Sequence, residues 1–214
     1  MRKHSKFKNI LILLLLLLIY TFICAFSYVN AVSTNIQDSV FRLHVIANSD
    51  SEEDQNLKYI VRDKVLEYIA DISKDLSSKE EVIDFAMENI NEIQKIAEKT
   101  IKENGYNYPV KLSIGNFAFP TKTYGDISLP SGMYDALKIE IGNAEGKNWW
   151  CVMFPPLCFV DVTSGIVPEE SKEIMKDSLS DEEYELISES NTDMNFKFKI
   201  IEMFQNINLN LAQI

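Results

Sequence analysis

Residues 40–46 have the sequence VFRLHVI. Its odd positions are apolar and positions 42 and 44 are arginine and histidine, an alternation that predicts a β-strand with one buried face. A polar loop over 47–54 follows. Apolar residues then recur every three or four positions across 57–72, which predicts a helix with one apolar face. Either Ser49 with Glu52 or Ser51 with Asp54 has the spacing of a helix-capping pair.

Further elements can be predicted outward from this strand and helix. A second helix is expected from Ser78 to Ile101, with Asn104-Gly105 as its C-terminal stop. Strands are expected at 109–114, 134–141 and 149–154, and an aromatic-rich loop or edge strand at 115–125. Residues 142–148 have the composition of a hairpin connection, so 149–154 should pair with 134–141. Because 149–154 is apolar on both faces, we expect it to be a central strand.

The C-terminal part differs in composition from the rest. Ten acids and two lysines lie between 168 and 193, which predicts a solvated helix over 181–188, and an amphipathic helix is expected over 196–211. The strands cluster instead of alternating with helices. The sequence therefore predicts an α+β fold, with a mostly antiparallel sheet packed against a helix pair and C-terminal helices beyond it, after an N-terminal hydrophobic helix.

The N-terminus has the composition of an export signal. Four basic residues precede an apolar run over 10–26, and Val29-Asn30-Ala31 offers small residues at the −3 and −1 positions of a cleavage site after Ala31. We therefore expect residues 1–31 to be a signal peptide or membrane anchor. Residues 32–214 should form one exported domain, with a core over 38–165 and an acidic helical part over 166–214. The run is long for a signal peptide and short for a spanning helix, so both cleavage and anchoring by residues 10–26 stay open.

The charge of the exported domain limits its partners. The chain has 21 basic and 32 acidic residues, and four of the basic ones lie in the first 31 residues, where there are no acids. The remaining 17 basic and 32 acidic residues give a formal charge of about −15. Such a surface repels phosphate backbones and anionic lipid headgroups, which argues against nucleic-acid binding and against adhesion of the domain to a membrane by charge.

Few residues could carry chemistry. The exported domain has one histidine, His44, and its only plausible nucleophile is Cys151; a structural histidine is the simpler interpretation. Cys151 and Cys158 are the cysteines beyond the leader, and in an oxidising compartment they form either a disulfide or two buried thiols. Their spacing does not match a zinc site. The acids over 50–54 lack the glycine and ligand spacing of a calcium loop, so capping explains them better.

Aromatic residues form the most unusual surface candidate. Trp149 and Trp150 are adjacent and so point to opposite faces of their predicted strand, and Phe117, Phe119 and Tyr124 lie in the aromatic-rich segment. An exposed tryptophan would be a partner-binding anchor, whereas a C-terminal helix could instead cover it.

Three segments together carry a resemblance to a known family. They are FRLHVIANSD over 41–50, FPTKTYG over 119–125 and GKNWWCVMFPPLCFVD over 146–161. In this order and spacing the chain resembles stage II sporulation protein R of endospore-forming bacteria, over about residues 38 to 165. The acidic C-terminal part carries no recognised motif.

The resemblance implies a signalling protein without catalytic residues or a cofactor. Such a protein is secreted across the forespore inner membrane into the intermembrane space. There it activates a membrane-embedded aspartic protease of the mother cell, which processes the pro-sigma-E precursor. We expect a contact surface that includes Lys122, Tyr124, Trp149 and Trp150. Two alternatives stay open: an envelope enzyme using Cys151 and His44, and a module that binds a cell-wall polymer.

Overall fold

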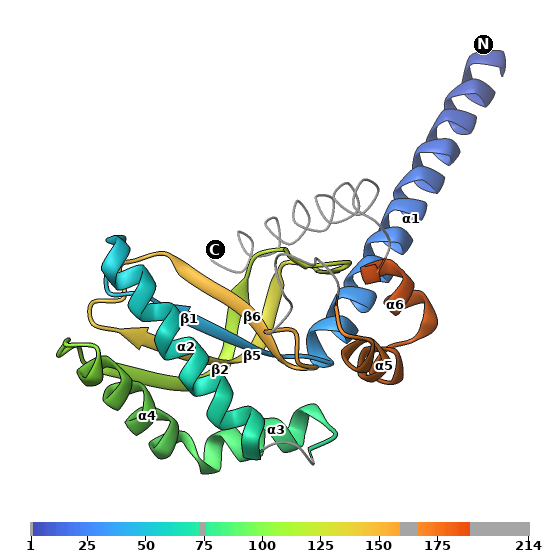
Figure 1. Cartoon of the computed structure of the whole chain (residues 1–214). Coiled ribbons are helices and arrows are strands. Elements are labelled where there is room, and N and C mark those ends of the chain that lie inside the picture. The colour runs from blue at the N-terminus through green and yellow to red at the C-terminus, as the bar shows by residue number, and fades with distance from the viewer. Residues whose placement is uncertain (1, 73–75, 159–166, 189–214) are drawn as a thin grey trace.

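The computed structural model describes residues 2–72, 76–158 and 167–188. Within these ranges the chain is a mixed α+β fold, with a four-stranded sheet, a two-stranded sheet and six helices, which confirms the predicted class (Figure 1). The expected helix over 196–211 lies outside the described residues.

The main sheet has the strand order β2-β5-β1-β6. Its strands are β1 (Phe41–Ile46), β2 (Val110–Phe119), β5 (Gly132–Ile141) and β6 (Asn148–Phe154). β1 runs parallel to β5, and the pairs β1–β6 and β2–β5 are antiparallel. Two of the three pairings are therefore antiparallel, as expected, and the predicted strand over 109–114 extends to Phe119.

The prediction for β6 was wrong in two respects. Its partner is β1, not β5, because β1 lies between them, and β6 is an edge strand of the sheet, not a central one. Residues 142–147 are thus no hairpin but cross the end of β1, where Glu145 and Gly146 donate backbone hydrogen bonds to the carbonyls of Asn48 and Ala47. Apolar residues on both faces of β6 reflect that both faces of the sheet are covered there, not that the strand is central.

Three helices cover one face of the sheet (Figure 1). They are α2 (Glu52–Ile72), α3 (Lys79–Glu88) and α4 (Ile90–Glu103). The hydroxyl of Ser51 accepts a hydrogen bond from the backbone N–H of Asp54, so the second of the two predicted capping pairs begins α2. The predicted single helix over 78–101 is divided at Asn89, whose side chain donates to the carbonyl of Phe85.

The predicted helix stop at Asn104-Gly105 is confirmed. Gly105 has φ +87°, the left-handed conformation that glycine adopts without a steric penalty. The N–H groups of Gly105 and Tyr106 bond the carbonyls of Lys102 and Ile101, which satisfies two carbonyls at the end of α4.

The helix-covered face holds the larger hydrophobic core. Side chains of β1, β5 and β6 interdigitate there with those of α2 and α4, including Leu43, Leu137 and Cys151 from the sheet and Val61 and Ile93 from the helices. All five are at most 1% exposed. Removal of this apolar surface from water is the main term that stabilises the fold.

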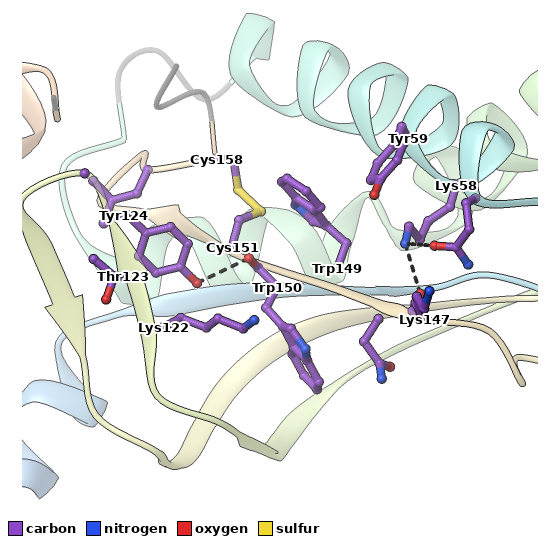
Figure 2. A pocket seen from close by; sticks show the side chains of 14 residues that line it. Lys58, Tyr59, Lys122, Thr123, Tyr124, Lys147, Trp149, Trp150, Cys151 and Cys158 are labelled. Atoms are coloured by element: carbon purple, nitrogen blue, oxygen red, sulfur yellow. Dashed lines mark hydrogen bonds between the residues drawn. A yellow bond between two sulfur atoms is a disulfide. The ribbon is translucent and has the colours of Figure 1, made fainter. Parts of the chain in front are cut away.

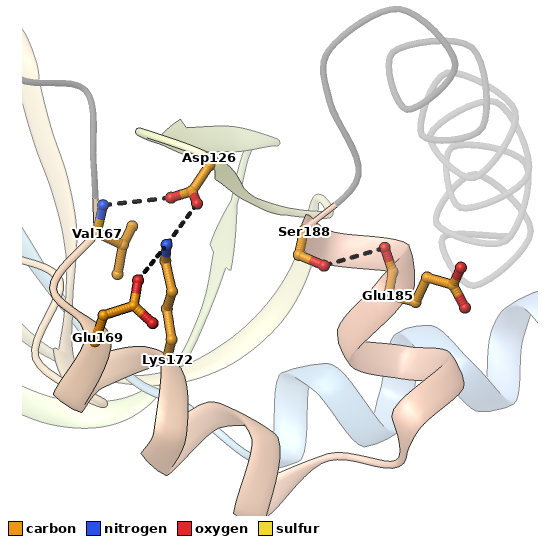
Figure 3. A network of polar contacts seen from close by, with 6 residues as sticks. All are labelled: Asp126, Val167, Glu169, Lys172, Glu185 and Ser188. Atoms are coloured by element: carbon orange, nitrogen blue, oxygen red, sulfur yellow. Dashed lines mark hydrogen bonds and ion pairs between the residues drawn. The ribbon is translucent and has the colours of Figure 1, made fainter.

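A second core forms on the opposite face. It is built from the end of α1, the ribbon β3 (Lys122–Tyr124) and β4 (Ile127–Leu129), and the helices α5 (Glu169–Ser178) and α6 (Asp181–Ser188). Lys172 of α5 binds Asp126 at 2.7 Å and Glu169 at 3.1 Å, and Asp126 also accepts from the N–H of Val167 (Figure 3). The predicted helix over 181–188 is present, but it is not simply solvated, because its Ile187 is fully buried.

The leader is helical from Arg2 onward. α1 (Arg2–Asp38) extends away from the domain, and its C-terminal part packs against the domain, where Ile36 is fully buried (Figure 1). Residues 6–38 of this helix are long and apolar enough to cross a membrane, a property that a signal sequence shares. The expected boundary at Ala31 lies within this helix.

Candidate functional site

A pocket of about 440 Å³ lies along the outer edge of β6 (Figure 2). We call it the edge pocket. It is lined by Gln55, Lys58 and Tyr59 of α2, by residues 122–125 of β3 and its turn, by residues 147–151 at the start of β6, and by Leu157 and Cys158. All four residues expected at a contact surface, Lys122, Tyr124, Trp149 and Trp150, are among them. The fold therefore brings two distant segments of the sequence together at one place.

The two tryptophans leave β6 on opposite faces, as adjacent strand residues must. Trp150 stacks on His44 of β1, with ring centroids 3.7 Å apart, and meets Phe119 edge-on at 4.6 Å. Trp149 lies on the helix side, where the Tyr59 ring meets it edge-on at 5.4 Å and the guanidinium of Arg62 lies 4.2 Å from its ring centre. Both tryptophans are partly exposed.

Tyr124 fixes the β3 side of the edge pocket. Its hydroxyl accepts a hydrogen bond of 2.7 Å from Arg42 and donates one of 3.2 Å to the carbonyl of Trp150. Burial raises the pKa of Tyr124 above its usual value, so the hydroxyl stays protonated and able to donate. The ribbon β3–β4 is thereby joined to both β1 and β6.

Sequence reasoning missed the contribution of α2 to this pocket. Lys58 and Tyr59 line it from the helix, and Lys147 lines it from the start of β6. The available signal was Lys58 itself, because a lysine three residues before Val61 and seven before Val65 interrupts an apolar stripe. The amphipathic pattern was interpreted only as core.

The two cysteines form a disulfide in the structure, with Cα atoms 5.1 Å apart. Cys151 is 1% exposed and points to the helix-covered face, whereas His44 points to the opposite face, stacks on Trp150 and is hydrogen-bonded to Asn148 at 2.7 Å. The structure therefore does not bring Cys151 and His44 together, which removes the geometry that a cysteine–histidine enzyme needs.

The acids that follow β1 have structural partners. Asp54 accepts hydrogen bonds from Asn48 and Ser49, and Asp50 accepts one from the backbone N–H of Lys147. Within the described residues no cluster of three metal-ligating side chains is present. These carboxylates hold the end of β1 to the connection between β5 and β6, and so position the start of β6 in the pocket wall.

Comparison with known proteins identifies the family. The family described as stage II sporulation protein R matches residues 37–164. A relative from Bacillus subtilis (strain 168), also called stage II sporulation protein R, is 42% identical over 143 residues, which cover 66% of this chain and 64% of the relative. No solved structure matches the chain significantly. The matched residues contain β1–β6 and the described lining of the edge pocket. This chain belongs to the stage II sporulation protein R family.

Proposed function

We propose that this chain is an exported sporulation signal that activates a membrane-embedded aspartic protease of the mother cell, which then processes the pro-sigma-E precursor. The observation that carries the proposal is membership of a sporulation family by a chain that begins with an apolar leader helix. The signal crosses the forespore inner membrane and acts in the intermembrane space, either free or anchored by residues 10–26.

The leader supports export in this orientation. Its basic residues precede the apolar run, and positive charge next to an apolar segment stays on the cytoplasmic side of the membrane. The rest of the chain is then delivered to the far side, where it meets proteins of the opposing membrane.

The edge pocket is the proposed contact surface. It combines partly exposed aromatic rings with basic side chains, and interface hot spots are enriched in such aromatic residues. Activation follows if the domain binds the active arrangement of the protease more tightly than the inactive one. Moving that equilibrium from 1:99 to 99:1 requires a difference in binding free energy of about 5.5 kcal/mol.

The test is co-expression of this chain, the protease and the precursor in a heterologous cell. We expect precursor cleavage only when all three are present, and loss of cleavage with Trp150→Ala in a chain that still folds. Met133→Ala, which removes an exposed apolar side chain outside the edge pocket, is the control and should keep full activity. Cleavage that proceeds equally without this chain would contradict the proposal.

A further inference from the structure

The charge of the edge pocket is opposite to that of the domain. Its lining includes Lys58, Lys122 and Lys147, and no carboxylate is among the described residues that line it. The exported domain carries a formal charge of about −15. Three lysines around one hollow in so acidic a domain form a local positive field, which favours an anionic group.

Lys58 is an unusual member of this group. The residue is 1% exposed, and its ammonium donates to Gln55 Oε1 at 2.6 Å and to the Lys147 carbonyl at 3.0 Å. No carboxylate of a described residue lies within ion-pair distance of the Lys58 ammonium, although the Asp50 carboxylate is near enough to interact with it electrostatically. Burial lowers the pKa of Lys58, and the charges of Arg62 and Lys147 lower it further. A buried ammonium without an ion-pair partner gains from a bound anion.

The edge of β6 adds main-chain groups to the same site. The Trp150 carbonyl accepts from Tyr124, and the Val152 carbonyl accepts from the N–H of Leu157, so both point away from β1. Because both backbone groups of an antiparallel strand residue point to one side, the N–H of Trp150 and the backbone groups of Asn148 also face outward. An extended peptide can pair with groups of this kind at a sheet edge.

We propose that the edge pocket binds an extended, carboxylate-bearing segment of the partner protein, which lies along β6 at Asn148 and Trp150 with its carboxylate among Lys58, Lys122 and Lys147. This inference rests on the proposed function, and it adds the chemistry of the segment that the protease presents. The aromatic rings of Tyr59, Trp149 and Tyr124 enclose the segment and exclude water from the charged contact. The lysines select an acidic sequence, and the edge selects an extended one.

The experiment uses the full chain in the co-expressing cells. A photo-crosslinking amino acid replaces Thr123, an exposed residue of the pocket lining, and the same replacement at exposed Lys99 on α4 is the control. We expect irradiation to join position 123, and not position 99, to a segment of the protease that contains aspartate or glutamate. Crosslinks to a segment without an acid, or none at position 123 in cells that cleave the precursor, would overturn the inference.

Charge exchange provides the second measurement. Lys122→Glu and Lys147→Glu should each reduce both crosslinking and precursor cleavage at least tenfold, whereas Lys99→Glu should change neither. Replacing the crosslinked acid of the protease by lysine should restore cleavage with Lys122→Glu or Lys147→Glu. Cleavage that depends on this chain but is unaffected by either reversal would reject the acidic segment and leave the proposed function intact. If the unaltered chain produces no cleavage, the proposed function fails and this inference fails with it.

Discussion

The Arg42 guanidinium donates a 2.7 Å hydrogen bond to the hydroxyl of Tyr124, which joins the buried strand β1 to the outer ribbon β3–β4. Arg42 is fully buried, and its guanidinium carbon lies 4.2 Å from the ring centre of Phe119 and 4.6 Å from that of Tyr134. Aromatic faces attract a desolvated cation, so these rings offset part of the cost of burial. The arrangement places Tyr124 where its hydroxyl also reaches the edge of β6.

Tyr124→Phe should destabilise the domain. It removes the 2.7 Å hydrogen bond from Arg42, and Arg42 Nε and Nη1 already have no hydrogen-bond partner among the described residues. The loss of a hydrogen bond to a buried charge costs about 1–3 kcal/mol of unfolding free energy. Urea-induced unfolding of the chain from residue 32 onward measures this cost. Tyr106→Phe, whose hydroxyl has no hydrogen bond to a described residue, should stay within about 0.5 kcal/mol of the unaltered protein, and equal losses in the two variants would refute the account of Arg42.

Gly146→Ala should disrupt the crossing of the β5–β6 connection over β1. A Cβ at Gly146 would overlap the carbonyl oxygen of Ser49, and a shift of Gly146 away from Ser49 would strain its hydrogen bond to the Ala47 carbonyl. We expect a loss of at least about 2 kcal/mol, in the range of an overpacked core. Gly115→Ala is the matched control, because its Cβ would come no closer than 3.6 Å, to the Phe117 ring. Thermal unfolding of both variants is the measurement, and a Gly146→Ala protein as stable as the control would contradict this geometry.

The disulfide should protect the turn that follows β6. Closing a loop of about eight residues stabilises the folded state by about 2–3 kcal/mol in the chain-entropy model. Intact-mass analysis of the secreted protein should show no alkylation at Cys151 or Cys158 before reduction. Cys158→Ser should then lose that stability, whereas Cys24→Ser, in the leader, should not. Quantitative alkylation of both cysteines in the folded, unreduced protein would show that they are free thiols.

His44 should titrate below its ordinary pKa. Burial under Trp150 lowers the pKa of His44, and the hydrogen bond with Asn148 acts in the opposite direction but is the weaker influence. Because the unfolded chain then binds a proton at higher pH than the folded one, the stability due to neutral His44 is present above pH 6.5 and is lost as the pH falls through that value toward the folded pKa. His44 is the only histidine after residue 31, so one imidazole signal in an NMR titration reports it. A midpoint above 6.5 would mean that the charged neighbours outweigh burial.

Local sequence signals predicted most of the elements but not their neighbours in the sheet. Alternation identified β1, and the Ser51 cap and Gly105 marked a helix start and a helix end, since these depend on nearby residues alone. The position of β6 depends on β1, more than 100 residues earlier, and no local pattern records that β1 is inserted beside β5. No glycine or proline marks the break at Asn89, and the apolar spacing continues through it. The sequence therefore predicted one helix where the structure has two.

The candidate site was predicted only in part, because local patterns again did not show which elements are neighbours in space. Tyr124, Trp149 and Trp150 are conspicuous as aromatic residues in sequence, and Lys122 lies two residues before Tyr124. Lys58 reaches the pocket because α2 packs near the start of β6. The sequence alone does not predict that these two elements are neighbours. The place of Lys58 on an apolar stripe was the one signal available.

The proposed function requires that the domain acts after export, by contact with a partner in the opposing membrane. The most direct measurement is the fraction of precursor cleaved in co-expressing cells when export alone is blocked. Leu14→Arg with Leu16→Arg places two charges in the apolar run of the leader and leaves the domain unchanged, and each arginine costs about 2.5–3.5 kcal/mol of insertion free energy. We expect cleavage with the native leader and none with the charged one, although folded protein accumulates in both. Equal cleavage with the two leaders would contradict the account.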